Sequence, residues 1–161
     1  MLLLEAPAPA RNGDLLDLGC GAGPIALTMA RRSPQASVWA VDVNERAREL
    51  CVDNARENGI ANVRVAAPDD VPAEVRFATI WSNPPIRIGK AQLHSLLRQW
   101  LPRLAEGGQA VLVVQKHLGA DSLATWLGVE GWNVDRMTSR SGYRLLRITQ
   151  RAGGDHQATP R

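Results

Sequence analysis

The sequence predicts an α/β fold of the doubly wound type, with a mostly parallel, seven-stranded sheet covered by helices and an antiparallel hairpin at the C-terminal end. Short apolar runs alternate with amphipathic helical stretches, as the crossovers of a parallel sheet require. The last two apolar runs are joined by the turn residues 139–142, which leaves no room for a helix and predicts a hairpin. We expect one domain over residues 1–149 and a disordered tail over 150–161, where periodicity is lost.

Composition excludes several classes of protein. Of the 161 residues, 45% are hydrophobic and 22% are charged, which is typical of a globular domain and not of a disordered or membrane protein. No apolar run approaches the roughly 20 residues of a membrane span, and Met1–Glu5 is too short for a secretory signal, so we expect a cytoplasmic protein. Cys20 and Cys51 lack metal-ligand spacing, so we expect packed thiols and no metal or disulfide. The net charge of +3 suits a polyanionic partner and simple solubility equally well.

The first half of the chain predicts three strands and two helices. The strands are expected over residues 15–18, 38–41 and 63–66. The first helix is expected over 24–32, with one apolar face formed by Ile25, Ala26, Met29 and Ala30. The second helix is expected to start after an N-cap at Asn44 and to end before a C′ residue at Gly59. Its inward face is predicted to consist of Ala47, Leu50, Cys51, Asn54 and Ala55.

The second half predicts the remaining strands. A fourth strand over 77–81 precedes a helix that is expected to stop at Gly107-Gly108. The apolar stripe of that helix comprises Leu93, Leu96, Leu97, Trp100, Leu101 and Leu104. Residues 110–114 form the most apolar strand, which we expect to be central, and the helix after it is expected to turn inward Leu123, Trp126 and Leu127. The strands of the hairpin are expected over 132–136 and 144–148.

A glycine-rich segment, Asp17-Leu18-Gly19-Cys20-Gly21-Ala22-Gly23, connects the first strand to the first helix. An open α/β sheet binds nucleotides at this point, and glycine lets the backbone turn sharply and approach a ligand. A dinucleotide fingerprint would place glycine or alanine where this chain has Pro24, so a pyrophosphate ligand is disfavoured. The acid at Asp17 suits a ligand with an ammonium and a sulfonium better than one with phosphates.

This segment, together with Asp42 at the end of the second strand, resembles the class I S-adenosylmethionine-dependent methyltransferases, whose fold is Rossmann-like. The resemblance implies S-adenosylmethionine as the cofactor, with its methionine moiety at Asp17, Gly19, Cys20, Gly21 and Gly23. It also implies that Asp42 accepts both ribose hydroxyls and that Asp69 receives the adenine amino group. Asp42 lies twenty-three residues after Gly19, close to the spacing of a ribose-binding acid. Alternatively, Asp42 is an N-cap or turn residue and Asp69 belongs to a solvated acidic loop.

The tetrapeptide Asn83-Pro84-Pro85-Ile86 follows the fourth strand. Two prolines cannot continue a sheet, so the chain must leave the strand in a rigid turn. The side-chain oxygen of Asn83 and the carbonyl of Pro84 then offer two acceptors to an NH2 group, although such a tripeptide can also be an ordinary turn. The resemblance makes this the catalytic motif of amino-group methyltransferases, formed by Asn83, Pro84, Pro85 and Ile86, with Asn83 also bordering the cofactor.

The resemblance implies a mechanism without a dedicated general base before transfer. Asn83 and Pro84 would hold a poorly nucleophilic amino nitrogen toward the methyl group, favour its pyramidal form and stabilise the positive charge that builds on it. Many relatives have Tyr, Phe or Trp after the two prolines to stack on the target. This chain has Ile86, so that aromatic platform is lost.

Among these enzymes the chain is most similar to the small-subunit (16S) ribosomal RNA guanine-N2 methyltransferases. The similarity lies in the segments 16–25, 82–86 with Gly89-Lys90, and 139–143. It implies transfer to guanine N2 and a ribosomal RNA or small-subunit partner contacted by Arg87, Lys90, Lys116 and His117. Arg140 and Arg144 are further candidates, and each of these cations can equally be a solvated surface charge.

The chain departs from that family before the first strand. Relatives usually carry a segment there that folds over the cofactor, whereas here only Met1–Arg11 precede the strand, and Leu2-Leu3-Leu4 resembles the end of a lost helix. We therefore expect poor affinity for S-adenosylmethionine, or a natural chain that begins further upstream. Low-micromolar binding in isothermal titration would contradict the first expectation.

Two other readings of the motifs stay open. The acceptor can instead be a protein glutamine, as in release-factor methyltransferases, or DNA adenine, although Ile86 is less typical of both. The chain can also be a non-catalytic relative that binds the cofactor or RNA without turnover.

Overall fold

The computed structural model describes residues 6–84 and 88–152, and of Leu118 the backbone only. Seven strands form one sheet in the order β3-β2-β1-β4-β5-β7-β6. Their bounds are β1 Asp14–Leu18, β2 Ser37–Val41, β3 Val63–Ala66, β4 Phe77–Ser82, β5 Leu104–Gln115, β6 Trp132–Arg140 and β7 Tyr143–Gln150. β3, β2, β1, β4 and β5 run parallel, while β7 pairs antiparallel with both β5 and β6. The predicted fold class is confirmed.

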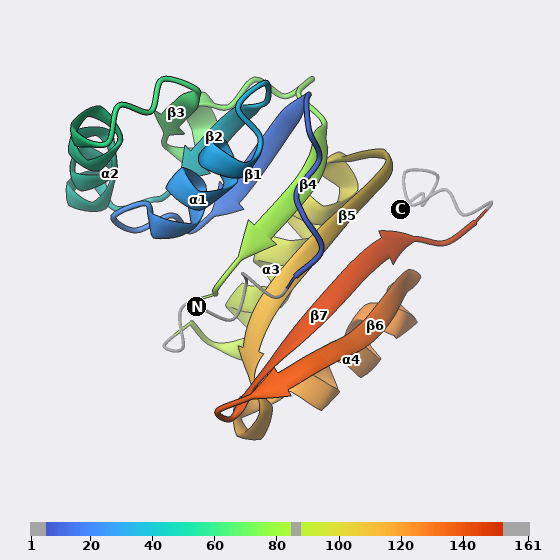
Figure 1. The fold of residues 1–161 in the computed structure, drawn as a ribbon. Coiled ribbons are helices and arrows are strands. Elements are labelled where there is room, and N and C mark those ends of the chain that lie inside the picture. The colour runs from blue at the N-terminus through green and yellow to red at the C-terminus, as the bar shows by residue number, and fades with distance from the viewer. Residues whose placement is uncertain (1–5, 85–87, 153–161) are drawn as a thin grey trace.

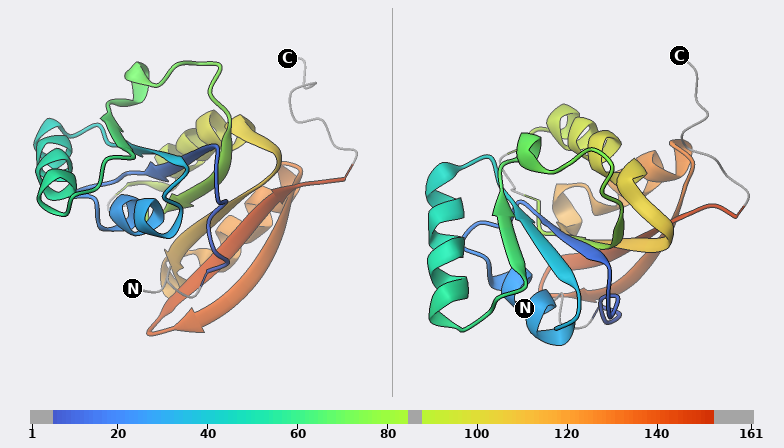
Figure 2. Two further views of the ribbon diagram at one scale, coloured as in Figure 1. Left: turned by 45° about the horizontal axis from the view of Figure 1, so that its top comes forward. Right: turned by 90° about the horizontal axis from the view of Figure 1, so that it is seen from above.

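Helices cover both faces of this sheet (Figures 1 and 2). Their bounds are α1 Pro24–Arg32, α2 Glu45–Glu57, α3 Lys90–Trp100 and α4 Ala120–Val129. On one face Met29 of α1 and Cys51 of α2 are fully buried in one apolar cluster with Trp81 of β4. On the other face Leu97 of α3 and Leu127 of α4 are buried in a second cluster. None of the described helices has the length and apolarity that crossing a bilayer demands.

The returning strand of the C-terminal hairpin occupies an interior position. β7 lies between β5 and β6, with Val113 opposite Leu145, so β6 is the edge of the sheet. β5 is an interior strand, next to the central strand β4. The predicted turn over 139–142 is shorter in the structure, because the strands extend to Arg140 and from Tyr143 and leave only Ser141 and Gly142 between them.

The prediction for the end of the third helix is wrong. α3 ends at Trp100, and a short 3₁₀ turn over Leu101–Arg103 follows. Pro102 explains the end, because proline has no N–H to continue the α-helical hydrogen bonding, although Leu101 before it still has helical dihedrals. Gly107 and Gly108 therefore lie inside β5. A Cβ on Gly108 would stand 2.9 Å from the carbonyl oxygen of Phe77, so the two strands approach closely there.

Other helical predictions agree in type and differ in detail. The side chain of Asn44 caps α2 by accepting a 2.9 Å hydrogen bond from the Ala47 N–H, as predicted. The inward face of α2 is narrower than predicted, since Cys51 and Ala55 are buried but Leu50 is 36% exposed. Trp126, expected to point inward from α4, is only partly buried. Of the predicted tail, Gln150 belongs to β7 and residues 153–161 lie outside the described residues.

Candidate functional site

The candidate site lies where the strand order reverses. β1 and β4 are neighbours in the sheet, but their connections run to opposite sides, toward β2 and toward β5. Open α/β sheets bind ligands at the carboxyl ends of strands at such a switch point. The glycine segment follows β1 and Asn83 follows β4, so the two predicted motifs flank this point (Figure 1).

The glycine segment is held in place by backbone hydrogen bonds that it donates to β2. The N–H groups of Gly19 and Cys20 both donate to the Val41 carbonyl, at 2.8 and 2.9 Å. Gly19 and Gly21 have φ angles of +79° and +53°, and a Cβ on either would meet no atom of the described residues within 4 Å. The space above these two glycines is therefore open to a ligand.

Gly23 has a different role from Gly19 and Gly21. A Cβ at this position would stand 2.6 Å from the Sγ of Cys51, so glycine is required for the packing of α2 against the segment. The side chains of Cys20 and Cys51 are buried, as the prediction of packed thiols requires. The hydrogen bond with Cys51, together with burial, raises the pKa of Cys20, so this residue stays a neutral thiol.

Asp42 connects the glycine segment to the start of α2. Its Oδ2 accepts from the Gly21 N–H and its Oδ1 from the Asn44 N–H, both at 2.9 Å. Each carboxylate oxygen has a second lone pair, so the side chain can also accept from two hydroxyls. The proposed turn role and the proposed ribose role are thus compatible, and the ribose contact stays a prediction.

Asp17 is completely buried behind the glycine segment. Neither of its oxygens has a hydrogen-bond partner in the described part of the chain. Burial raises the pKa of Asp17 to about 8, with smaller contributions from Cys51 and Asp42, and the nearby Ala26 N–H only partly opposes this. An unpartnered carboxyl behind an open loop fits a ligand that brings positive charge, although direct contact with the cofactor stays a prediction.

The raised pKa of Asp17 should make the free energy of unfolding depend on pH. The folded state keeps this proton up to about pH 8, whereas the unfolded chain loses it near 3.8, so the folded state binds more protons in between. Stability should therefore fall as pH rises through this window, by at most about 1.4 kcal/mol per pH unit. In urea unfolding at pH 5 and pH 8, Asp17→Asn should lose less stability than the parent, while the exposed Asp53→Asn should behave like the parent. Equal pH dependence in Asp17→Asn and the parent would contradict this assignment.

Ser82 places Asn83 beside the glycine segment. Its hydroxyl is buried and donates a 2.8 Å hydrogen bond to the carbonyl of Leu18, the last residue of β1. Asn83 is exposed and Pro84 is partly buried. Pro85, Ile86 and Arg87 lie outside the described residues, so their predicted roles stay predictions.

The other predicted residues lie along the same edge of the sheet. Asp69 is exposed in the short turn Pro68–Asp70 after β3. Lys90 starts α3, and Lys116 and His117 follow β5; all three are exposed. The Lys116 N–H donates to the Gly142 carbonyl at 2.8 Å, which brings the β6–β7 turn to this edge. The cations thus lie on the β4–β5 side of the glycine segment and Asp69 on the β2–β3 side.

Three residues support the site without having been assigned that role from the sequence: Asn54, Arg48 and Ser82. Asn54 donates from Nδ2 to the Ala22 carbonyl at 2.9 Å, and Arg48 donates to the Asp42 carbonyl at 2.8 Å. Asn54 was expected only on an inward helix face. The sequence does contain a signal for Ser82, because a hydroxyl residue at the end of an otherwise apolar strand indicates a specific hydrogen bond. We see no such signal in the sequence for Arg48.

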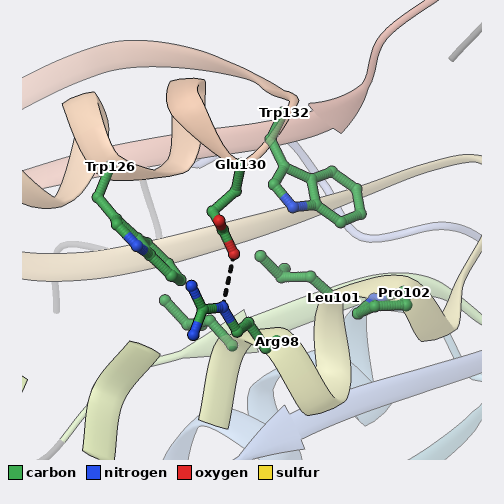
Figure 3. A pocket seen from close by; sticks show the side chains of 7 residues that line it. Arg98, Leu101, Pro102, Trp126, Glu130 and Trp132 are labelled. Atoms are coloured by element: carbon green, nitrogen blue, oxygen red, sulfur yellow. Dashed lines mark hydrogen bonds and ion pairs between the residues drawn. The ribbon is translucent and has the colours of Figure 1, made fainter. Parts of the chain in front are cut away.

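A hollow of about 230 Å³ lies away from this edge, between the C-terminal parts of α3 and α4 (Figure 3). Arg98 and Glu130 form an ion pair of 2.6 Å inside it, and Trp126 and Trp132 form part of its wall. His94 stacks on Trp126 with ring centroids 3.7 Å apart. Because both helices start at the edge that carries Asn83, their C-terminal parts lie at the other end, and this hollow is separate from the candidate site.

Comparison with known proteins shows the family of this chain. The model of the methyltransferase small domain matches residues 1–147. The uncharacterized protein YbxB of Bacillus subtilis is 37% identical over 150 residues, which cover 91% of this chain and 75% of that protein. The ribosomal RNA small subunit methyltransferase C of Shewanella halifaxensis is 31% identical over 89% of this chain.

The match with that second relative covers only part of it, since the chain spans 42% of its length. Among solved structures, a ribosomal protein L11 methylase from Lactobacillus delbrueckii subsp. bulgaricus superposes with a TM-score of 0.75 at 21% identity. The superposition covers 93% of this chain and 75% of that chain. At this identity the likeness supports the fold alone.

Proposed function

Because this chain belongs to the methyltransferase small domain family, and so is a class I methyltransferase that uses S-adenosylmethionine, we propose that it methylates an exocyclic amino nitrogen, guanine N2 of ribosomal RNA. One observation carries the proposal. The Ser82–Leu18 hydrogen bond holds the end of β4 against the end of β1. Asn83, the residue after β4, therefore follows a strand end that is fixed next to the glycine segment, which would hold the methyl donor.

The residues fit the cofactor in three respects. Among the described residues nothing fills the space above Gly19 and Gly21, and Asp42 has free lone pairs. Asp17 is a buried carboxyl without a hydrogen-bond partner in the described part of the chain, and a positively charged ligand would favour its ionised form. When bound, S-adenosylmethionine supplies an electrophilic methyl group on a sulfonium. Gly19 and Gly21 would let the backbone approach it, and Asp42 would accept from its ribose.

Asn83 and Pro84 would act on the acceptor. The Oδ1 of Asn83 and the carbonyl of Pro84 would each accept a hydrogen bond from the acceptor NH2, which directs the nitrogen lone pair toward the methyl group. These acceptors would also stabilise the positive charge that develops on nitrogen during transfer. Water would remove the extra proton after transfer, so no side chain is required as a base beforehand.

Support for RNA as the acceptor comes from the relatives and from the charges at the site. The relative of Shewanella halifaxensis, and one of Escherichia coli that is 32% identical over 73% of this chain, are both named ribosomal RNA small subunit methyltransferase C. Lys90 and Lys116 are exposed at the same edge of the sheet as Asn83, and a phosphate backbone is attracted to such cations.

Labelled S-adenosylmethionine tests the acceptor class directly. The purified protein is incubated with small ribosomal subunits, free small-subunit RNA, a release factor, or DNA, and label is counted in each fraction. We expect label in RNA, from subunits or from free RNA. Label in the release factor or in DNA would overturn RNA as the acceptor, and cofactor binding without label in any fraction would indicate a non-catalytic relative.

A further inference from the structure

A small cavity lies beside the candidate site, between the first turns of α3 and α4. Its volume is about 100 Å³, and Lys90 and His94 of α3, Ser122 of α4 and Val114 of β5 contribute to its wall. α3 follows β4 and α4 follows β5, so the cavity opens at the edge of the sheet that carries Asn83. Nothing in the proposed methyl transfer uses it.

The polar groups around this cavity can donate hydrogen bonds to an anion. Lys90 carries a positive charge, and the hydroxyl of Ser122 makes only a long 3.3 Å hydrogen bond to the Gly119 carbonyl, which an incoming acceptor can replace. No carboxylate belongs to the described residues of its wall. The nearest acid in sequence, Asp121, is engaged with Arg136 at 3.2 Å.

Arg144 adds a second cation next to the cavity. In the antiparallel register of β5 and β7, Arg144 stands directly opposite Val114, which belongs to the cavity wall. It alternates with Leu145, which is buried on the opposite face, so its side chain leaves the sheet on the α3–α4 side. Its Nε is buried and has no hydrogen-bond partner in the described part of the chain, which leaves a charged donor unsatisfied on the side of the sheet where the cavity lies.

The electrostatic environment of His94 supports a positive potential here. Burial lowers the pKa of His94, and the positive charges of Arg98 and Lys90 lower it further, while the negative charge of Glu130 opposes them with a smaller effect. A group in such a field attracts anions, and a bound anion would oppose the lowering. The ring of His94, stacked on Trp126, is therefore a fixed internal probe of charge in the cavity.

We propose that this cavity binds one backbone phosphate of the nucleic-acid acceptor, through Lys90, Ser122 and Arg144, next to the nucleotide whose amino group meets Asn83. The inference rests on the proposed function and adds the contact that positions the strand. A monoanionic phosphate group matches two cationic side chains and a hydroxyl donor. An unphosphorylated acceptor such as a protein glutamine would leave the cavity unused.

Binding of a short single-stranded RNA to the cofactor-loaded protein tests this site. We expect Ser122→Ala to weaken binding a few-fold and Arg144→Gln about 10-fold, while Arg144→Lys retains most of the affinity. The slope of log Kd against log salt should fall by about 0.7 in Arg144→Gln, as for one lost phosphate contact. The matched controls, Ser95→Ala on the exposed part of α3 and Arg56→Ala on α2, should leave the affinity and the slope unchanged.

A second measurement separates this site from the proposed function. Histidine NMR signals are followed while guanosine, guanosine 5′-monophosphate or inorganic phosphate is added. We expect the pKa of His94 to rise with the monophosphate and with phosphate, but not with guanosine, and not in Arg144→Gln. If guanosine and its monophosphate have equal effects, the phosphate site is wrong even where methyl transfer to RNA is observed. A phosphate response without RNA methylation would instead leave the site standing and overturn the acceptor.

Discussion

Asn83→Ala is expected to lower the rate of methyl transfer about 100- to 1000-fold, equivalent to about 3–4 kcal/mol of transition-state stabilisation. The alanine removes one of the two acceptors that would orient the amino nitrogen and stabilise the charge that develops on it. Because Asn83 is an exposed residue after the end of β4, its loss should not unfold the protein. Single-turnover kinetics with saturating cofactor would isolate this effect from changes in binding.

Two further variants serve as controls for Asn83→Ala. Asn83→Asp keeps a side-chain oxygen as acceptor and should recover part of the rate. Asn133→Ala changes an exposed asparagine of β6, which pairs with β7 and lies away from the site, and should match the parent. A rate for Asn83→Ala within a few-fold of the parent would show that this residue does not have the assigned role.

Asp42→Ala is expected to raise the Kd for S-adenosylmethionine at least about 100-fold. Two hydrogen bonds from ribose hydroxyls to a carboxylate would be lost, each worth about 1.5–3 kcal/mol. The substitution also removes the acceptors of the Gly21 and Asn44 N–H groups, which anchor the glycine segment and the start of α2. Isothermal titration with the cofactor measures the loss.

A loss of affinity in Asp42→Ala must be separated from a loss of folding. Asp42→Asn keeps one acceptor oxygen, so it should bind more tightly than the alanine variant but more weakly than the parent. Asp53→Ala removes an exposed acid of α2 whose ion pair with Arg56 is long, at 3.7 Å, and should bind as the parent does. Unchanged affinity in a folded Asp42→Ala would refute the ribose assignment.

Most elements of the fold could be predicted because local signals and tertiary packing agree. The helix over 24–32 was predicted with its four buried residues because Ile25, Ala26, Met29 and Ala30 lie at helical spacing on one face, while Leu27 beside them is only partly buried. The third helix was predicted too long because Leu101 and Leu104 continue its apolar period, although Pro102 stops the helix and Leu104 starts a strand. Here the apolar spacing predicts a longer helix, but the missing N–H of Pro102 determines where the helix ends.

The candidate site was predictable where a residue type is required by backbone geometry. Gly19 and Gly21 have positive φ angles, and Asn83 is marked by the proline after it. The Ser82–Leu18 hydrogen bond spans 64 residues, so it depends on which strands become neighbours and not on spacing in the sequence. The same holds for Arg144 opposite Val114, whose place beside the cavity follows from the antiparallel register of β7 on β5.

Nucleoside analysis of methylated RNA tests the central claim most directly. Small ribosomal subunits or their RNA are incubated with the protein and labelled S-adenosylmethionine, the RNA is digested to nucleosides, and the labelled nucleoside is identified by mass. The proposed function predicts N2-methylguanosine, formed by the parent protein and reduced at least about 100-fold in Asn83→Ala. Label in N6-methyladenosine, in a carbon-methylated base or in a ribose methyl group would contradict guanine N2 as the acceptor.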